Sequence, residues 1–569
     1  MLRAPRQLCL LMFALLLTAC GGGSSQVTPP TITLVTPIPT TIAAGSRLQL
    51  SAVVANSSNT TVLWYVNAIP GGNSAVGTIT PQGLYTAPDM PTANGTVVIS
   101  ASPQAYPAAV TSVTIGITFS NASLNGNFVF TLNGTQSASP WAAVGSFTAG
   151  NGQIGSGVED INGPSGVSTA LPFSGSYFID ASGIGIATFT SSQGSVNLSF
   201  TLNTQGQAVV MRTDSGTTAS GNFYAQQSTA LTLTNLNAAY VFSFSGNASG
   251  KSLNAIGTFV TNGTNTLTYA EEDLNLGGST ANQPFSGSYS IGSGARGTAS
   301  FTDSTGTRSY SFYLVSPNQL QFIETDSTGN LSGTAFQQQS VTSTSTLAGG
   351  YVFYAAGSNG TSAYGIAGGF ATSTTVGGTI NAGTSDINLA GTLASNSTLT
   401  GSFIYGTSGR GTITLNGASG ANNYVYYEIT PTSAFLLSSD PGINASGLLF
   451  LQTGGFSTVA LSGNYTLSLA SPAGATPTLS MGLLTLNGIG AIAGFENTND
   501  NGTASGQLSV TGTYAVTASS TNTSTRGLMT LTTNGGTSTN FAFYPISSGS
   551  LILLGAGPSP VSGLMVSQY

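Results

Sequence analysis

The phrase FSGSY occurs at residues 173–177 and again at 285–289, and the related phrases LTGSF and VTGTY follow at 399–403 and 510–514. An apolar opening precedes each phrase, beginning at Leu124, Leu236, Leu347 and Leu461. These openings are 112 (236 − 124), 111 (347 − 236) and 114 (461 − 347) residues apart. Self-similarity at a fixed period indicates tandem structural units. The sequence therefore predicts four copies of one unit, at 122–227, 234–339, 346–452 and 460–569.

Each unit is a series of short candidate strands joined by turns rich in Gly, Asn and Ser. Alternating aromatic residues, as in Tyr240, Phe242 and Phe244, place one face of each strand in a core. Eight antiparallel strands of this kind close naturally into an up-and-down barrel, because closure removes exposed edges. In the first unit we count eight strands: 128–132, 142–147, 153–160, 175–179, 185–189, 196–202, 208–212 and 221–225. The predicted fold class is all-β, with four small barrels.

An eight-bladed propeller is the alternative arrangement of the repeats. LNGNF at 124–128 and FSGSY at 173–177 share a pattern 49 residues apart (173 − 124), which suits a blade of four strands. Low charge and aromatic alternation also resemble outer-membrane porins. Separate repetition, strands of mostly five to seven residues and a lipid anchor argue against a membrane-spanning barrel.

The N-terminus is a targeting segment. Arg3 and Arg6 precede an apolar run, Leu8 to Leu17, that ends at Leu17-Thr18-Ala19-Cys20. This end resembles the lipobox of bacterial lipoproteins. The resemblance implies that residues 1–20 are the signal peptide region, that Cys20 carries the lipid, and that Gly21 behind it favours the outer membrane. Residues 21–29 are then a flexible tether. The alternative is a plain secretory peptide that is cut near Ala19.

Composition excludes several chemistries. The chain has 569 residues, only 4% of them charged, and no His. Without Arg3 and Arg6 the mature charge is 7 − 16 = −9, so nucleic acid is a poor partner. A Ser-His-Asp triad and an imidazole metal site are excluded, and Cys9 leaves with the signal, so no thiol remains for a zinc centre. We expect no cofactor other than calcium.

The segment at 30–119 precedes the repeats. Short strands such as TVLWYV and GTVVISAS, separated by turn residues, predict a β-sandwich with Trp64 in its core. LWYVN followed by GTITPQGLYTAP resembles bacterial Ig-like domains. The chain as a whole resembles lipoproteins with an N-terminal Ig-like domain followed by tandem β repeats, a resemblance that implies a spacer or adhesion role.

A small set of acids and amides recurs in register within the repeats. Glu159-Asp160-Ile161-Asn162 is followed at the same place in later units by 272–275, 385–388 and 496–499. Calcium at a strand end is one interpretation of D-x-N, and turn capping by the short side chains is the favoured one. The candidate residues for either role are Asp160, Asn162, Asp273, Asn275, Asp386 and Asn388. Asp214, Asp326 and Asp440 recur similarly.

Arginine also recurs, before a glycine. Arg296, Arg410 and Arg526 occupy one position of the second, third and fourth units, and Ile184 replaces them in the first. Because arginine forms bidentate pairs with carboxylates, we expect its partners among the recurring acids.

Three functional hypotheses follow. The leading one is a non-enzymatic cell-envelope lipoprotein, held in the outer membrane by its lipid, whose β modules serve adhesion or bind polysaccharide or a surface protein through aromatics such as Trp141 or Tyr364. A purely structural envelope protein is the second. A glycan-acting enzyme built on Glu271, Glu272 and Asp273 is disfavoured, because adjacent strand residues point to opposite faces.

Overall fold

The computed structural model describes residues 28–227, 232–339, 347, 349–372, 378–418, 420–454, 456–517, 525–534, 536, 538–557 and 560–569. Cys20, whose lipidation is predicted above, lies outside these residues. The described chain is built of 45 strands and five short 3-10 turns. Within it no helix is both long and apolar enough to cross a membrane. The prediction of an all-β fold is confirmed.

The first eleven strands form a layered β domain before the repeats. Their sheets have the orders β1-β4, β2-β11-β10-β5-β6 and β3-β9-β8-β7. They enclose one core, in which Trp64 and Tyr85 are buried, as the sequence predicts for Trp64. The strands are β1 (Thr31–Leu34), β2 (Thr41–Ala43), β3 (Arg47–Gln49), β4 (Ala52–Ala55), β5 (Val62–Val66), β6 (Ile69–Pro70), β7 (Gly72–Asn73), β8 (Gly77–Ile79), β9 (Leu84–Thr86), β10 (Thr96–Pro103) and β11 (Thr111–Thr118).

The first and third repeat units are closed eight-stranded barrels, called here barrel 1 and barrel 3. Neighbouring strands pair antiparallel all the way around, so the barrel is confirmed and the propeller is wrong. Barrel 1 consists of β12 (Gly126–Gln136), β13 (Ser139–Gly150), β14 (Gln153–Gly163), β15 (Gly166–Ile179), β16 (Ile184–Ser191), β17 (Gly194–Leu202), β18 (Gln207–Arg212) and β19 (Thr217–Ala225). Barrel 3 consists of β29 (Gly349–Asn359), β30 (Ser362–Thr372), β31 (Thr379–Leu389), β32 (Thr392–Tyr405), β33 (Arg410–Gly417), β34 (Gly420–Thr430), β35 (Ser433–Ser438) and β36 (Ile443–Leu451).

The second and fourth units, barrels 2 and 4, have their strands in the same order as barrels 1 and 3, but one strand in each is broken into two. In barrel 2 an isolated bridge between Thr266 and Ser288 joins the two sheet edges, and in barrel 4 pairing of β38 with β39 closes the sheet. Barrel 2 consists of β20 (Ala239–Ala248), β21 (Lys251–Thr261), β22 (Leu267–Leu276), β23 (Ser279–Pro284), β24 (Ser286–Ile291), β25 (Arg296–Asp303), β26 (Gly306–Ser316), β27 (Gln319–Glu324) and β28 (Gly329–Gln337). Barrel 4 consists of β37 (Ser462–Ala470), β38 (Thr478–Asn487), β39 (Ala491–Asp500), β40 (Thr503–Ala504), β41 (Leu508–Thr517), β42 (Arg526–Thr533), β43 (Ser538–Ser547), β44 (Ser550–Gly555) and β45 (Ser562–Ser567).

Many strands are longer than the sequence suggests. Those of barrel 1 run from six residues in β18 to 14 in β15, whereas the sequence predicts strands of mostly five to seven residues. The expectation was too short because the outward faces carry Ser, Thr and Gly, which hide the strand ends in a chain where turns have the same composition.

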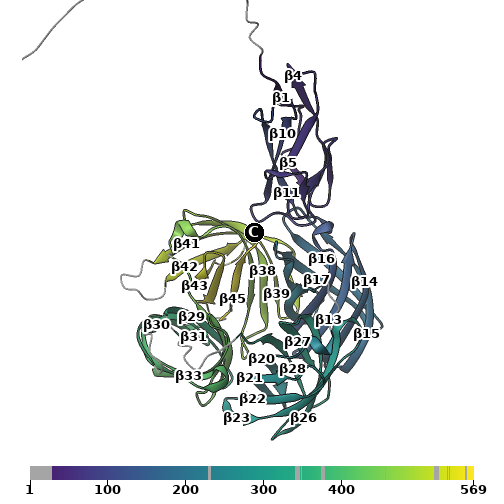
Figure 1. Cartoon of the computed structure of the whole chain (residues 1–569). Helices are drawn as coiled ribbons and strands as arrows, with labels where there is room; N and C mark the ends of the chain where they lie inside the picture. The colour runs from purple at the N-terminus through teal and green to yellow at the C-terminus, as the bar shows by residue number, and fades with distance from the viewer. Residues whose placement is uncertain are drawn as a thin grey trace, which may run out of the picture.

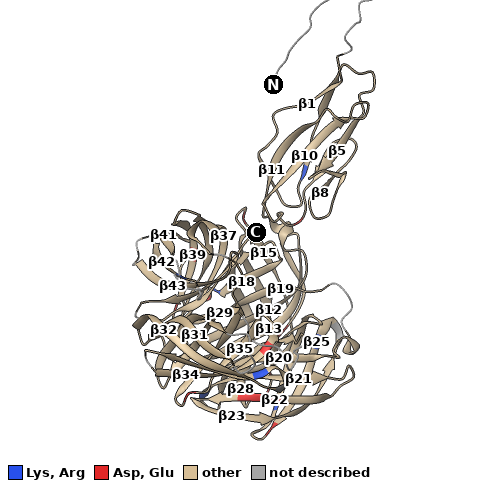
Figure 2. Ribbon diagram, turned by 60° about the vertical axis from the view of Figure 1, so that its left-hand side comes forward, with Lys and Arg blue, Asp and Glu red and all other residues tan. Residues whose placement is uncertain are grey.

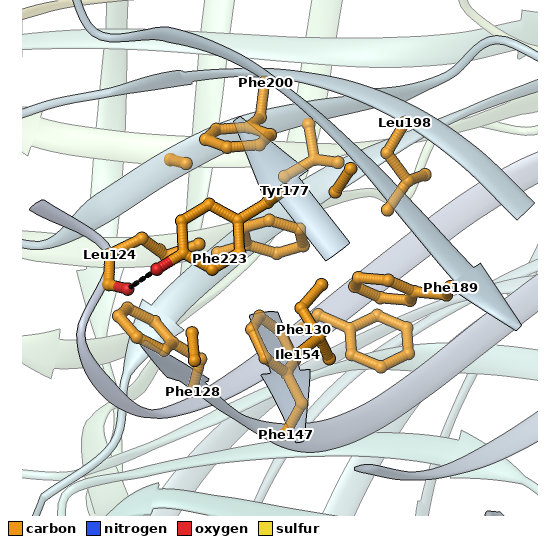
Figure 3. Packing of buried hydrophobic residues seen from close by; sticks show 14 of the residues in the cluster. Leu124, Phe128, Phe130, Phe147, Ile154, Tyr177, Phe189, Leu198, Phe200 and Phe223 are labelled. Carbon is orange, nitrogen blue, oxygen red and sulfur yellow. Dashed lines mark hydrogen bonds between the residues drawn. The ribbon is translucent and has the colours of Figure 1, made fainter. Parts of the chain in front are cut away.

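The FSGSY phrase is explained by the barrel interior. Phe173 and Tyr177 are both buried in the core of barrel 1. The Tyr177 hydroxyl donates to the carbonyl of Leu124 at 2.6 Å (Figure 3). A Cβ on Gly175 between them would lie 1.9 Å from the carbonyl oxygen of Thr188 on the next strand, a separation that only glycine avoids. Stacked phenylalanines such as Phe173 and Phe189, 4.7 Å apart, fill the rest of the interior.

The four barrels form a closed ring. Consecutive barrels touch along their walls, and β38 of barrel 4 packs against β17, β18 and β19 of barrel 1, so the last unit returns to the first. Figure 1 shows the ring, with the N-terminal domain projecting from it beside barrel 1. Phe119, at the end of that domain, packs into the core of barrel 1. The centroids of the aromatic side chains of Phe119 and Tyr569 are 6.1 Å apart. The ring thus has four junctions, of which the one between barrels 4 and 1, called here the closing junction, joins the two ends of the repeat array.

Candidate functional site

The recurring acids lie at the junctions between barrels. In the E-D-x-N sequence alternate side chains point to opposite sides of the strand, so Glu159 faces the interior of barrel 1 and Asp160 faces barrel 2. Arg296 of barrel 2 donates to Asp160 from Nε and Nη2 at 2.8 and 2.6 Å, and the hydroxyl of Tyr313 donates at 2.5 Å. Asp160 is fully buried. The few charged groups of this chain are therefore placed at specific positions (Figure 2).

The same Asp-Arg-Tyr triad joins the next two pairs of barrels. Asp273 accepts from Arg410 and Tyr427, all at 2.8 Å. Asp386 accepts from Arg526 at 2.7 Å through both nitrogens and from Tyr544 at 2.5 Å. These contacts confirm the predicted pairing of the recurring arginines with the recurring acids.

Hydrogen bonding sets the charge state of the third triad. Burial raises the pKa of Asp386, but the hydrogen bonds from Arg526 and Tyr544 outweigh it and hold that pKa below its ordinary value. Arg526 has its pKa raised by the same carboxylate. Asp386 and Arg526 are therefore both charged at neutral pH, and each depends on the other inside the junction.

The closing junction has no triad. Asn497 stands where the other units have Asp, Ile184 stands where they have Arg, and Thr201 occupies the position of the tyrosine, paired with Ile184 on the adjacent strand. Asn497 donates from Nδ2 to the Ser199 hydroxyl at 3.1 Å instead. Both members of the ion pair are thus replaced at the same junction, Arg by Ile184 and Asp by Asn497. Neither charge is left without its partner.

The asparagines of D-x-N join all four pairs of barrels. In each unit the side-chain Nδ2 donates to two backbone carbonyls of the neighbouring barrel, which lie in the turn between its last two strands. The bonds run from Asn162 to Glu324 and Gly329, from Asn275 to Ser438 and Ile443, from Asn388 to Gly555 and Gly557, and from Asn499 to Arg212 and Thr217, all at 2.7–3.0 Å.

Three of these asparagines also accept within their own turn. The Oδ1 atoms of Asn275, Asn388 and Asn499 receive the N–H of the residue three positions on, at 2.9–3.0 Å. Asp160 and Asp386 likewise accept one N–H each from their own barrel, from Ala170 and Asn396. Among the described residues no three His, Cys, Asp or Glu side chains gather around a space for a metal ion. Calcium binding stays a prediction.

Sequence reasoning missed a second set of junction residues. Gln226, Gln338, Gln452 and Gln568 follow the last strand of each unit, and each Nε2 donates to a backbone carbonyl of the next barrel around the ring. The acceptors are Leu314, Glu428, Pro545 and Leu202, at 2.6–3.1 Å. The signal was present, because these glutamines recur at the repeat period, 112 residues apart in the first pair (338 − 226).

Trp141 and Tyr364 are not exposed aromatics, contrary to the hypothesis that they bind sugars at the surface. Each is buried in the wall of its barrel, with 4% and 3% of its surface exposed. Both occupy inward positions of a strand, where a large ring fills the barrel end. Trp141, however, borders a pocket of about 120 Å³ at one mouth of barrel 1.

That pocket combines a cation, an acid and an aromatic ring. The guanidinium carbon of Arg212 lies 4.7 Å from the centroid of the Trp141 ring, and its Nε donates to Asp214 at 2.7 Å. Glu159 and the polar side chains of Ser191 and Gln193 also line the pocket. Within the described residues, the structure shows no hydrogen bond from the terminal nitrogens of Arg212. Glu159 and Arg212 together offer an acceptor and a donor to a small polar group.

Burial raises the pKa of Glu159 to about 7. The hydrogen bond with Ser191 and the charge of Arg212 lower this pKa, but by less than burial raises it. Glu272, at the same position of barrel 2, also has its pKa raised by burial to about 7. Its surroundings differ, because Arg308 and Asp303 pack beside it and the cavity there is only about 10 Å³. Barrel 2 therefore has the buried acid without the open pocket.

These two acids predict a pH dependence of stability. Between pH 4.5 and 7 the folded chain retains protons that the unfolded chain has released, so the free energy of unfolding should fall as pH rises through this range. Glu159→Gln removes one of these two titrating groups. The free energy of unfolding of the variant should therefore change less steeply with pH, and the stability of the variant relative to the parent should rise toward pH 8. Urea unfolding at pH 5 and pH 8 measures both. Identical pH slopes for parent and variant would contradict this assignment.

The chain is thus a ring of four antiparallel β-barrels with a small β domain attached. No protein-family model matches the sequence, and no curated protein does either. Among solved structures, similarity is found to a mutant of transferrin binding protein B from Haemophilus parasuis, at 12% identity and a TM-score of 0.16, over 63% of this chain and 81% of that one. A protein of unknown function from Nostoc punctiforme is similar at 9% identity and a TM-score of 0.11, over 50% of this chain and 97% of that one. At these TM-scores nothing about function follows.

Proposed function

We propose that this chain is a non-enzymatic cell-envelope lipoprotein that binds polysaccharide at the mouth of barrel 1. The observation that carries the proposal is the pocket in which buried Glu159 and Arg212 stand beside Trp141. A carboxylate and a guanidinium side by side suit the hydroxyl groups of a sugar, which both donate and accept hydrogen bonds. A pocket of about 120 Å³ admits the edge of one sugar unit, so the ligand is bound at a chain end or a branch.

Binding rather than hydrolysis is supported by the acids available. Glu159 is the one carboxylate among the residues that line the pocket, whereas glycoside hydrolysis ordinarily needs two facing carboxyl groups. Asp214, close by, is occupied by Arg212 and by the side chain of Asn197 at 2.8 Å. The lipid on Cys20 would hold the ring at the membrane, where envelope or extracellular polysaccharide is at hand.

A glycan array probed with the lipid-free Cys20→Ser protein tests the proposal, followed by calorimetric titration of any ligand found. Glu159→Gln should weaken binding by about tenfold, because a charge-assisted hydrogen bond is lost. Glu272→Gln is the matched control, since it changes the equivalent acid of barrel 2, and it should leave binding unchanged. Chromatography of the glycan after incubation should show no cleavage. Equal weakening by both variants, or cleavage of the glycan, would contradict the proposal.

A further inference from the structure

The ring encloses a cavity between its barrels. Its volume is about 590 Å³, and residues of all four barrels line it, among them Tyr224, Phe336, Tyr354, Phe435 and Leu564. This space is separate from the barrel interiors, which are filled by their own buried side chains, as Figure 3 shows for barrel 1. It is also separate from the pocket at the mouth of barrel 1, with which it shares no lining residue. A volume of this size is typical of small-molecule sites.

The repeat explains why the lining is uneven. The residue that follows the closing Ser-Gly faces the cavity in every unit, and it is Asn222 in barrel 1, Thr334 in barrel 2, Leu448 in barrel 3 and Leu564 in barrel 4. Equivalent positions have thus become polar on the side of barrels 1 and 2 and apolar on the side of barrels 3 and 4.

Among the described residues, none that lines the cavity is charged. A ligand with a free carboxylate or phosphate inside it would have no counter-ion, and burying such a charge is costly. The aromatic and aliphatic side chains in the lining suit hydrocarbon, and the Ser, Thr, Asn and Gln side chains beside them suit an uncharged polar group. The phenyl rings of Phe336 and Phe435, with centroids 6.1 Å apart at 26°, form one flat wall of the cavity.

Two residues at the cavity, Thr201 and Tyr354, have hydroxyl groups without a partner among the described residues. Thr201 is fully buried, and its hydroxyl makes no hydrogen bond in the described structure. Its hydroxyl oxygen has almost no exposed surface, so it lies within the closing junction, where Thr201 replaces the junction tyrosine, and does not face the cavity. For Tyr354 the structure likewise shows no hydrogen bond to a described residue, and burial raises its pKa to about 12, so it stays protonated.

From these observations we infer that the central cavity binds a neutral acyl lipid, an uncharged ester of a fatty acid. The hydrocarbon chain packs against the aromatic and leucine side chains of barrels 2, 3 and 4, and a carbonyl oxygen of the ester accepts a hydrogen bond from the hydroxyl of Tyr354. This site is additional to the polysaccharide site at barrel 1 and does not depend on it.

Displacement of N-phenyl-1-naphthylamine, a neutral dye that fluoresces in apolar sites, tests the inference on the Cys20→Ser protein. Monooleoylglycerol should displace the dye, and oleate at pH 8 should need at least ten times the concentration. Ala356→Phe, which fills the cavity, should abolish dye uptake, whereas Ala371→Phe, on the same barrel but outside the lining, should not. Circular dichroism spectra like the parent's show that both variants are folded.

Tyr354→Phe provides a second readout that does not rely on filling the cavity. It should weaken monooleoylglycerol several-fold and leave the affinity for the dye and for glycans unchanged, because only the ester loses a hydrogen bond. The inference is overturned if the dye is not taken up, if Ala356→Phe and Ala371→Phe bind it equally, or if oleate competes as well as the ester.

Discussion

Asp386→Ala should lower the free energy of unfolding by about 3–5 kcal/mol, the loss typical of a buried ion pair deprived of one partner. Asp386 is fully buried and Arg526 has 9% of its side chain exposed, so this is the best-shielded of the three triads. The variant leaves the guanidinium of Arg526 and the hydroxyl of Tyr544 without their acceptor. Urea denaturation followed by intrinsic fluorescence measures the loss.

The closing junction supplies the matched control for this prediction. Asp386→Asn with Arg526→Ile installs the two residues that stand there naturally, Asn497 and Ile184. Because no charge is then buried alone, the double variant should recover most of the stability lost in Asp386→Ala. The account of the triad is wrong if the double variant is as unstable as the single one.

Asn499→Leu should open the ring at the closing junction and lower the free energy of unfolding by about 3 kcal/mol. Asn499 is fully buried and makes four hydrogen bonds, two to carbonyls of Arg212 and Thr217 and two received from Thr218 and Gly502. Leucine keeps a similar size but leaves buried backbone groups unpaired, which costs about 1–3 kcal/mol each before relaxation. No triad supports this junction, so the two barrels should separate.

Hydrogen exchange resolved by mass spectrometry measures that opening. In Asn499→Leu, exchange should rise in β38 and in β17, which face each other across the closing junction. Asn275→Leu is the control, since the triad of Asp273 and Arg410 still holds its junction. Uniform exchange in both variants, with no rise at β38 and β17, would falsify the role given to Asn499.

The sequence was sufficient to predict the barrels because the period and the inward alternation are local properties. FSGSY marks a strand whose aromatics face inward and whose glycine avoids a neighbouring carbonyl, and both features recur in each unit. The pairing of Arg296, Arg410 and Arg526 with recurring acids was also predictable, because buried charges in so neutral a chain need partners.

The ring itself was not predictable from those patterns. In the sequence Ile184 is the exception among the recurring arginines, and Asn497 is a variant of the recurring aspartate. Nothing in these two substitutions places the first and last units in contact. Only the curvature of the array brings them together, and it depends on how barrel walls pack. The hypothesis that Trp141 is exposed and binds sugars was wrong for a related reason. A lone aromatic residue at a strand end has the same local sequence pattern whether it faces solvent or fills a barrel mouth.

The most direct test of the closed ring is a distance measured across the closing junction. In the Cys20→Ser protein, Ile186→Cys and Leu528→Cys place spin labels at equivalent exposed positions of barrels 1 and 4, with 61% and 53% of the native side chains exposed. Pulsed electron paramagnetic resonance should give one narrow distribution of the distance between the two labels. This distribution should broaden in Asn499→Leu. A broad distribution in the parent would mean that the barrels are strung as independent beads, and would contradict the ring.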